Sequence, residues 1–147
     1  ADLTPSHSEA AQVVRYLPSQ QYRPHFDWFD PTAGKSYRRK TAAGGQRAVT
    51  CLVYLAAPER GGRTSFPTLS LGFAPRVGDA VLWWNVDEAG VEDAGTLHAG
   101  DPVLCGEKWA LNIWLRQRPR RGAGGSEGAG QGKGAGESCT RNGESDD

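Results

Sequence analysis

The sequence predicts an all-β fold, either a sandwich or a barrel, on two observations. Short apolar and β-branched stretches recur along the first 121 residues, and turns that contain Gly or Pro separate them. No stretch after the first dozen residues shows the period of an amphipathic helix, so we expect helical structure only in this short N-terminal margin. The mouth of a barrel is a common place for a small-ligand pocket.

The first half of the body contains three expected strands and one expected loop. Residues 11–17 (AQVVRYL) carry a short apolar run, and residues 22–29 (YRPHFDWF) are rich in aromatic side chains, which suit a pleated surface. Residues 30–46 show no sustained period and are expected to form a long loop. Residues 47–55 (RAVTCLVYL) are β-branched and largely apolar, which predicts a strand buried on both faces.

The second half continues the pattern of strands and turns. Residues 58–62 predict a turn, and residues 80–84 form the next apolar run. An acidic loop, residues 86–95, leads to a strand-like segment at residues 96–99. Residues 108–116 (KWALNIWLR) predict the last strand.

Alternation along this last strand separates two faces. Every second residue from Trp109 to Leu115 is apolar, whereas the other face carries Lys108, Ala110, Asn112 and Trp114. A lysine and an asparagine opposite an apolar face predict the lining of a polar cavity. Alternation alone equally allows this face to meet solvent.

Composition divides the chain into three parts. The 147 residues include 17 Lys and Arg and 17 Asp and Glu, and they are enough for one domain. Residues 122–147 are rich in glycine and hold no aromatic or large aliphatic residue, so we expect this tail to be disordered. We therefore expect an N-terminal margin at residues 1–11, a single folded domain at residues 12–121, and the tail.

Several classes of protein are disfavoured. No apolar run is long enough to span a membrane, and the mild positive charge of the body argues against a nucleic-acid partner. Three cysteines without a CxxC spacing indicate neither a zinc knuckle nor a disulfide framework. The chain contains no Met and no signal peptide, so we expect a fragment or a processed chain, and the sequence alone predicts no compartment.

Three residues form a candidate metal site. His25 and Asp27 stand as H-x-D, so within a strand both side chains project from one face, and His98 follows much later in the chain. Two histidines and one carboxylate occupy one face of an octahedral Fe(II) site and leave positions for O2 and a chelating co-substrate. An H-x-D pair alone is weak evidence, because a core or loop histidine with satisfied hydrogen bonds is more common.

Lys108 extends this constellation. It follows His98 by a segment long enough for a turn and a return strand. An ammonium group beside the metal is what an anionic dicarboxylate co-substrate requires, since it holds the distal carboxylate while the other end chelates iron.

The motifs YLPSQQYRPHFDWFD, RAVTCLVYL, GGRTSFP, PRVGDAVLWWN and TLHAGDPVLCGEKWALNIWLR occur in this order. Together they resemble the prolyl 4-hydroxylase group of iron- and 2-oxoglutarate-dependent dioxygenases. The resemblance implies a double-stranded β-helix, or jelly roll. It also implies that His25, Asp27 and His98 bind iron and that Lys108 binds the distal carboxylate of 2-oxoglutarate.

The resemblance implies roles for four further residues. Thr64 would help to hold the same carboxylate, and the Tyr16 phenol would lie near 2-oxoglutarate. Arg47 and Trp114 would lie toward the peptide groove and the iron pocket. The alternatives are ordinary packing for Tyr16 and Trp114 and an exposed strand end for Arg47.

Two residues depart from the family pattern near these positions. Arg63 stands where the family usually has an acid, at the rim of the expected pocket. Asp101 stands where the family usually has a cysteine, and it would either accept a hydrogen bond from a ligand histidine or cap a turn.

The implied reaction is hydroxylation of a peptidyl proline at C4, with 2-oxoglutarate converted to succinate and CO2. The implied cofactors are Fe(II), 2-oxoglutarate, O2 and ascorbate, the implied partner is a Pro-rich peptide or protein, and the resemblance favours the endoplasmic reticulum or secretory pathway. Family domains usually carry a helical segment ahead of the barrel. Two alternatives therefore stay open: a truncated, non-catalytic metal-binding β-barrel that binds Pro-rich peptides, or a sibling lysyl or small-molecule hydroxylase.

Overall fold

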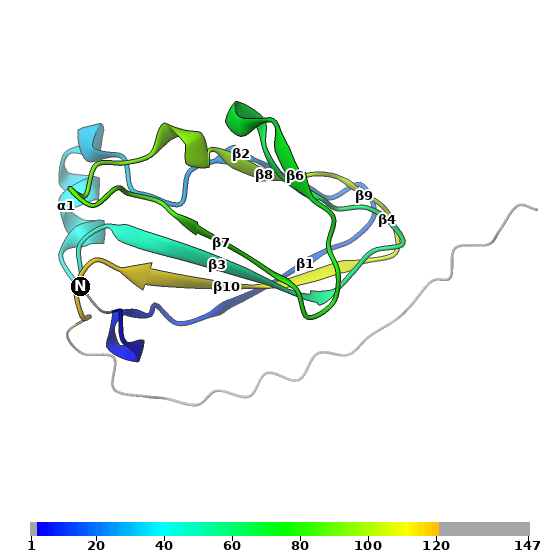
Figure 1. The fold of residues 1–147 in the computed structure, drawn as a ribbon, viewed down its shortest axis with the longest axis horizontal. Coiled ribbons are helices and arrows are strands. Elements are labelled where there is room, and N and C mark those ends of the chain that lie inside the picture. Colours follow the sequence, from blue (N-terminus) through cyan, green and yellow to red (C-terminus); the bar gives the residue numbers. More distant parts are fainter. Residues whose placement is uncertain (1–2, 121–147) are drawn as a thin grey trace, which may run out of the picture.

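The structure is a computed structural model that describes residues 3–120, and antiparallel strands dominate it (Figure 1). The larger sheet has four strands, in the order β1 (Gln12–Tyr16), β10 (Lys108–Arg116), β3 (Arg47–Ala56) and β7 (Ala80–Trp84). The smaller sheet has the order β2 (Tyr22–His25), β8 (His98–Gly100), β5 (Thr64–Phe66) and β6 (Leu71–Phe73). A third sheet pairs β4 (Arg60–Gly61) with β9 (Val103–Cys105). The all-β prediction is therefore confirmed for the described residues.

Helical structure between residues 3 and 120 is limited to short elements. This part of the chain contains four 3-10 turns, η1 (Pro5–His7), η2 (Pro31–Ala33), η3 (Pro67–Leu69) and η4 (Ala94–Thr96), together with one α-helix, α1 (Lys35–Thr41). In Figure 1 the smaller sheet lies above the larger one, with α1 at one end of the molecule and the β4–β9 pair at the other. Within the described residues, no helix has the length and apolar character needed to cross a membrane.

The predicted loop at residues 30–46 is partly helical, which corrects the sequence-based expectation. The Asp30 carboxylate accepts a hydrogen bond from the amide of Thr32 and starts η2, and α1 follows after Gly34. The carbonyl of Lys40 accepts a hydrogen bond from Arg116 of β10. A seven-residue helix is too short to show a readable apolar period, and this one depends on a distant side chain as well as on its own turns.

The last strand forms over the predicted residues, and its two faces differ as alternation requires. Lys108, Ala110 and Trp114 are buried, whereas Leu111 and Ile113 on the other face are only half-buried. The apolar side therefore does not form the main core of the sheet. Ala110 instead packs on the inner side, in a cluster of buried residues with Leu52 and Tyr54.

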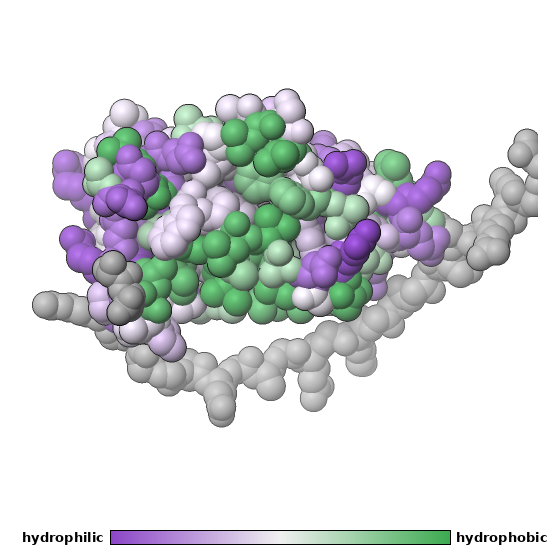
Figure 2. Space-filling model, viewed as in Figure 1, coloured by the Kyte–Doolittle hydropathy of each residue, from purple (hydrophilic) through white to green (hydrophobic). Residues whose placement is uncertain are grey.

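The prediction that residues 47–55 form a strand buried on both faces is wrong for the second half of β3. Leu52 and Tyr54 are buried on the inner side, but Leu55 is 43% exposed. On β7, Leu82 and Trp84, the cross-strand partners of Cys51 and Val49, are exposed as well, by 59% and 58%. Apolar side chains gather over the region where Figure 1 shows β7, β3 and β10 (Figure 2). At the other end of β3, Val49 is buried in a cluster against which Leu3 packs, so among residues 3–120 it is the second half of the strand that is buried mainly from the inside.

Other boundaries differ more modestly from the expectation. The aromatic segment at residues 22–29 is a strand only as far as His25, and the N-terminal helical margin is the single 3-10 turn η1. The strands β5, β6 and β9 were not predicted, because three-residue strands leave too little pattern to read. The predicted disordered tail at residues 122–147 lies outside the described residues.

Candidate metal centre and its cavity

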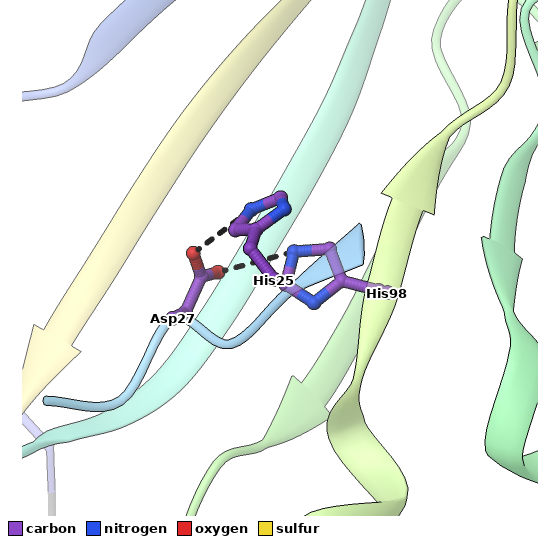
Figure 3. Close-up of side chains that lie close together, drawn as sticks. All are labelled: His25, Asp27 and His98. Atoms are coloured by element: carbon purple, nitrogen blue, oxygen red, sulfur yellow. Dashed lines mark ion pairs between the residues drawn. The ribbon is translucent and has the colours of Figure 1, made fainter. Parts of the chain in front are cut away.

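The three candidate metal ligands come together at the edge between β2 and β8. His25 ends β2 and is the cross-strand partner of His98, which begins β8, and Asp27 follows just after β2. The two carboxylate oxygens of Asp27 each lie 3.7 Å from the Nε2 atom of one histidine (Figure 3). One ligand atom from each residue fits within 4.8 Å of the others, so a single cation can contact all three.

Backbone carbonyls orient both imidazole rings. The Nδ1 atom of His25 lies 2.9 Å from the carbonyl oxygen of Arg23, and that of His98 lies 2.9 Å from the carbonyl oxygen of Thr96. A carbonyl only accepts, so each Nδ1 carries the hydrogen and each Nε2 keeps its lone pair for a metal. Burial lowers the pKa of His98 below its usual value, and this outweighs the opposing effect of the Asp27 charge. His98 therefore stays neutral, as a metal ligand must.

The donor set suits a divalent transition metal. Two imidazoles and one carboxylate are the facial set found in non-haem Fe(II) sites, which leave positions for further ligands. The three side chains point into a cavity of about 340 Å³. The residues present therefore fit Fe(II), with room beside it for a small co-substrate.

A buried lysine lies on one side of this cavity. Lys108 is 3% exposed, and its ammonium group donates a hydrogen bond of 2.8 Å to the carbonyl of Gly62. It also lies 3.4 Å from the Thr64 hydroxyl, which accepts a 2.8 Å hydrogen bond from the Tyr54 phenol. Burial lowers the pKa of Lys108 to about 8, against the opposing charge of Asp101. A carboxylate bound at this point would contact both the Lys108 ammonium and the Thr64 hydroxyl, and it would replace the water that burial removes from the ammonium.

The ring of Tyr16 completes this side. Its centroid lies 5.8 Å from the Lys108 ammonium, and burial raises the pKa of its phenol, so the hydroxyl stays protonated near neutrality. The expected position of Tyr16 near a bound dicarboxylate is consistent with this geometry.

An arginine and a tryptophan lie at the other end of β10. The Arg47 guanidinium stacks over the Trp114 ring at 3.8 Å, and the Glu9 carboxylate accepts hydrogen bonds of 2.7 and 3.0 Å from it. Glu9 also lies 2.7 Å from the Arg116 guanidinium. Burial alone would raise the pKa of Glu9, but the two arginines outweigh it and the pKa is lowered. Arg47 is thus held in place rather than exposed at a strand end.

All eight residues singled out in the sequence line this one cavity: Tyr16, His25, Asp27, Arg47, Thr64, His98, Lys108 and Trp114. The inner face of β10 lines it too, through Ala110 and Asn112, so this face does not simply meet solvent. Neither Arg63 nor Asp101 is among the lining residues. Asp101 accepts a 2.6 Å hydrogen bond from Ser65, whereas each ligand histidine uses a backbone carbonyl, so the expected contact with a ligand histidine is absent among the described residues.

Sequence reasoning missed the side chains that contact these residues from behind. The Thr50 hydroxyl reaches Asp27, Tyr54 reaches Thr64, and Glu9 reaches Arg47. The one feature of the sequence that could have indicated such a contact is Thr50, a polar residue within the apolar segment 47–55. Which residue each of these side chains contacts depends on the register between strands, and the register cannot be predicted from a local sequence pattern.

Comparisons with known proteins agree on one family. The family model of the 2OG-Fe(II) oxygenase superfamily matches residues 11–116. Human prolyl 4-hydroxylase subunit alpha-3 is 39% identical over 116 residues, which cover 79% of this chain and 21% of that protein. Prolyl 4-hydroxylase 1 of Arabidopsis thaliana is 38% identical over 125 residues, covering 76% and 42%.

Solved structures give the same result for the fold. A viral collagen prolyl hydroxylase from Paramecium bursaria Chlorella virus-1, solved with 2-oxoglutarate, superposes with a TM-score of 0.64 at 39% identity. The match covers 74% of this chain and 59% of the viral one. The predicted jelly-roll fold is therefore confirmed. The chain spans about a fifth of the human relative and less than half of the plant relative.

Proposed function

Because the chain belongs to the 2OG-Fe(II) oxygenase superfamily, we propose that it hydroxylates a peptidyl proline at C4 and converts 2-oxoglutarate to succinate and CO2. The observation that carries this proposal is a single cavity in which the His25, Asp27 and His98 cluster has a buried lysine on one side. The prolyl 4-hydroxylases among the relatives support the choice of proline.

In the half of the cavity that would hold the co-substrate, one group of residues binds the metal and another binds 2-oxoglutarate. His25, Asp27 and His98 hold Fe(II) through two Nε2 atoms and a carboxylate. Lys108 and the Thr64 hydroxyl bind the distal carboxylate of 2-oxoglutarate, and Tyr16 closes the cavity beside it. When bound, Fe(II) and 2-oxoglutarate supply the activation of O2, and the protein positions and shields them.

The substrate half uses Arg47 and Trp114. The indole Nε1 of Trp114 is buried and has no hydrogen-bond partner among the described residues. A buried donor without a partner is unfavourable, so a carbonyl of a bound peptide would satisfy it. Arg47 is fixed over the Trp114 ring and presents a guanidinium at the cavity, where it would contact the same peptide. A Pro-rich peptide in the polyproline II form exposes its carbonyls and suits this role.

We assign the catalytic unit to residues 12–121, with residues 1–11 as a margin and residues 122–147 as a Gly-rich tail. Glu9 shows how the margin supports the unit, since it pairs with Arg47 and Arg116. O2 as oxidant, ascorbate as the reductant that restores oxidised iron, and a compartment in the secretory pathway are parts of the same proposal and rest on family resemblance.

A non-catalytic β-barrel that binds metal and Pro-rich peptides is the second candidate. It is favoured by the exposed apolar side chains on the outer face of the larger sheet. A sibling hydroxylase of lysine or a small molecule would use the same three metal ligands. Resemblance favours proline, because family lysyl hydroxylases carry arginine where Lys108 stands.

A panel of Pro-rich and Lys-containing peptides distinguishes these candidates. The protein is incubated with Fe(II), 2-oxoglutarate, ascorbate and O2, and mass spectrometry detects a 16-Da gain while succinate is measured in parallel. Hydroxyproline formed in proportion to succinate supports the proposal. A gain on lysine, or peptide binding with no succinate above the His25→Ala control, would overturn it in favour of one alternative.

A further inference from the structure

A chain of buried hydrogen bonds runs from the larger sheet to the candidate metal ligand Asp27. The Thr50 hydroxyl of β3 donates to the Oδ2 atom of Asp27 at 2.7 Å. The Asn85 amide, just after β7, donates to the Thr50 hydroxyl at 2.8 Å. The indole of Trp83 donates to the Oδ1 atom of Asn85 at 3.0 Å. Thr50 and Asn85 are both completely buried, so water does not compete for these bonds.

The chemistry of the two ends fixes the direction of every bond. An indole N–H can only donate, so Trp83 turns the amide of Asn85 with its oxygen toward the ring and its nitrogen toward Thr50. The Thr50 hydroxyl accepts from that nitrogen, so its own single proton is left to point at Asp27. An ionised carboxylate can only accept, so it closes the chain at the other end. Reversing any one bond would leave a buried polar atom without a partner.

The same chain also reaches a second ligand. The Trp83 ring packs edge-on against the imidazole of His98, with ring centroids 4.7 Å apart. His98 and Asp27 come from distant parts of the sequence, and Trp83 and Thr50 are cross-strand partners on β7 and β3. One cross-strand pair of the larger sheet therefore contacts two of the three candidate ligands, and its Trp83 also lines the cavity.

We propose that Trp83, Asn85 and Thr50 form a positioning relay that fixes the Asp27 carboxylate for metal binding. None of the three bonds the metal directly in this assignment. Thr50 holds one carboxylate oxygen, Asn85 holds Thr50, and Trp83 sets the amide of Asn85 while it supports His98. The inference rests on the proposed function in taking Asp27 and His98 as metal ligands.

The test measures metal affinity rather than turnover. Mn(II) or Co(II) is titrated anaerobically into the metal-free protein, and its dissociation constant is obtained from the EPR signal of free Mn(II) or from the visible bands of bound Co(II). Thr50→Val keeps the shape of the side chain and removes the hydroxyl. We expect it to weaken binding about 10-fold to 100-fold, as loss of a group that orients a ligand typically does. Thr50→Ser should restore affinity to within about twofold of the original protein.

A matched control is available in the same cavity. Thr64 is equally buried, and it contacts the lysine side of the cavity instead of Asp27. Thr64→Val should leave metal affinity unchanged and weaken 2-oxoglutarate binding. Trp83→Phe keeps a ring against His98 and removes the N–H, so we expect a smaller loss of metal affinity, about threefold.

The outcomes separate the relay from the proposed function. Equal metal affinity in Thr50→Val and the original protein would overturn the relay. If Thr50→Val does not fold, unchanged affinity in Trp83→Phe would overturn it instead. Metal binding without any hydroxylation would remove the proposed activity and leave the relay standing, whereas a chain that binds no metal would remove both.

Discussion

The two faces of the larger sheet place side chains in opposite ways. On the inner face Thr50 is fully buried and Lys108 is 3% exposed, although each carries a polar group that burial disfavours. On the outer face Leu82 and Trp84 are more than half exposed. The polar groups of the inner face are satisfied by one another and by backbone carbonyls around one cavity. The comparison indicates that the inner face is built around the polar groups of one site. It predicts that substitutions of similar size will change ligand affinity and the free energy of unfolding far more on the inner face than on the outer face.

The largest effect is expected for the metal ligands. His25→Ala or Asp27→Ala removes one of three ligands, so affinity for Fe(II) should fall by about 100-fold or more. The anaerobic complex with 2-oxoglutarate should then lose its weak visible charge-transfer band. Thermal unfolding of the metal-free proteins provides the control for folding. An unaltered band in both variants would show that these side chains do not hold the metal.

A smaller effect is expected for Lys108. Lys108→Met removes one charge-assisted contact worth about 1.5–3 kcal/mol, so the dissociation constant of 2-oxoglutarate should rise roughly 10-fold to 100-fold. Metal affinity should stay within about twofold. Competition against a fluorescent 2-oxoglutarate analogue measures the first quantity, and Mn(II) titration measures the second. Equal losses of both affinities would contradict the separation of the two sites.

The same lysine predicts a pH dependence. Its pKa is lowered to about 8, and only the ammonium form attracts a carboxylate. The affinity for 2-oxoglutarate should therefore be flat below pH 8 and fall by up to about tenfold per unit above it. Lys108→Met should show no break near pH 8. A break that persists in this variant would have to come from another group.

An intermediate effect on stability is expected at Glu9, which joins the N-terminal margin to the inner face. Its pKa lies below the unfolded value, so its ion pairs stabilise the fold above about pH 4.5, and this contribution is lost as pH falls through the folded pKa. Glu9→Gln should lower the free energy of unfolding at pH 7 by about 2 kcal/mol. The difference should shrink as pH falls below about 4.5, because the unfolded chain then binds the proton before the folded protein does. Urea unfolding over a series of pH values from 7 downward tests this, and a deficit that does not change with pH would contradict it.

The smallest effect is expected on the outer face. Leu82→Ala removes a side chain that is 59% exposed, so the free energy of unfolding of this chain should change by less than about 0.5 kcal/mol. The inner counterpart Leu52→Ala, at 8% exposure, should cost about 2–5 kcal/mol. Urea unfolding of the pair measures the contrast directly. Similar losses for the two would mean that the outer face is covered in solution.

The sequence predicted the parts of the molecule that depend on short-range pattern. Alternation predicted the last strand and separated its two faces, and the H-x-D spacing predicted that His25 and Asp27 share one site, although Asp27 lies just after β2 and not within it. Family resemblance supplied four further residues that line the cavity, Tyr16, Arg47, Thr64 and Trp114. The two faces of a strand can be predicted from sequence because side chains two residues apart on an extended chain lie on the same face, whichever element packs against it.

The features that were missed depend on which strand or layer packs against a given segment. The contact from Thr50 to Asp27 and from Asn85 to Thr50 requires the register of β3 against β7, which no local pattern encodes. The helix α1 was predicted to be a loop because it has only seven residues and is supported by an arginine of β10, which a local pattern does not show. The burial of β3 was overestimated. An apolar sequence shows that a strand could be buried on both faces, but it does not show whether a second layer of the protein covers the outer one.

The pairing of His25 with His98 across two strands has one further consequence. A metal held by both residues would bind the folded protein and not the unfolded chain, so its binding free energy would add to the free energy of unfolding. Separation of β2 from β8 and release of the metal would then be one event. Amide hydrogens of these two strands should exchange more slowly in the presence of Fe(II) or Mn(II), and metal supply would set how long the smaller sheet persists.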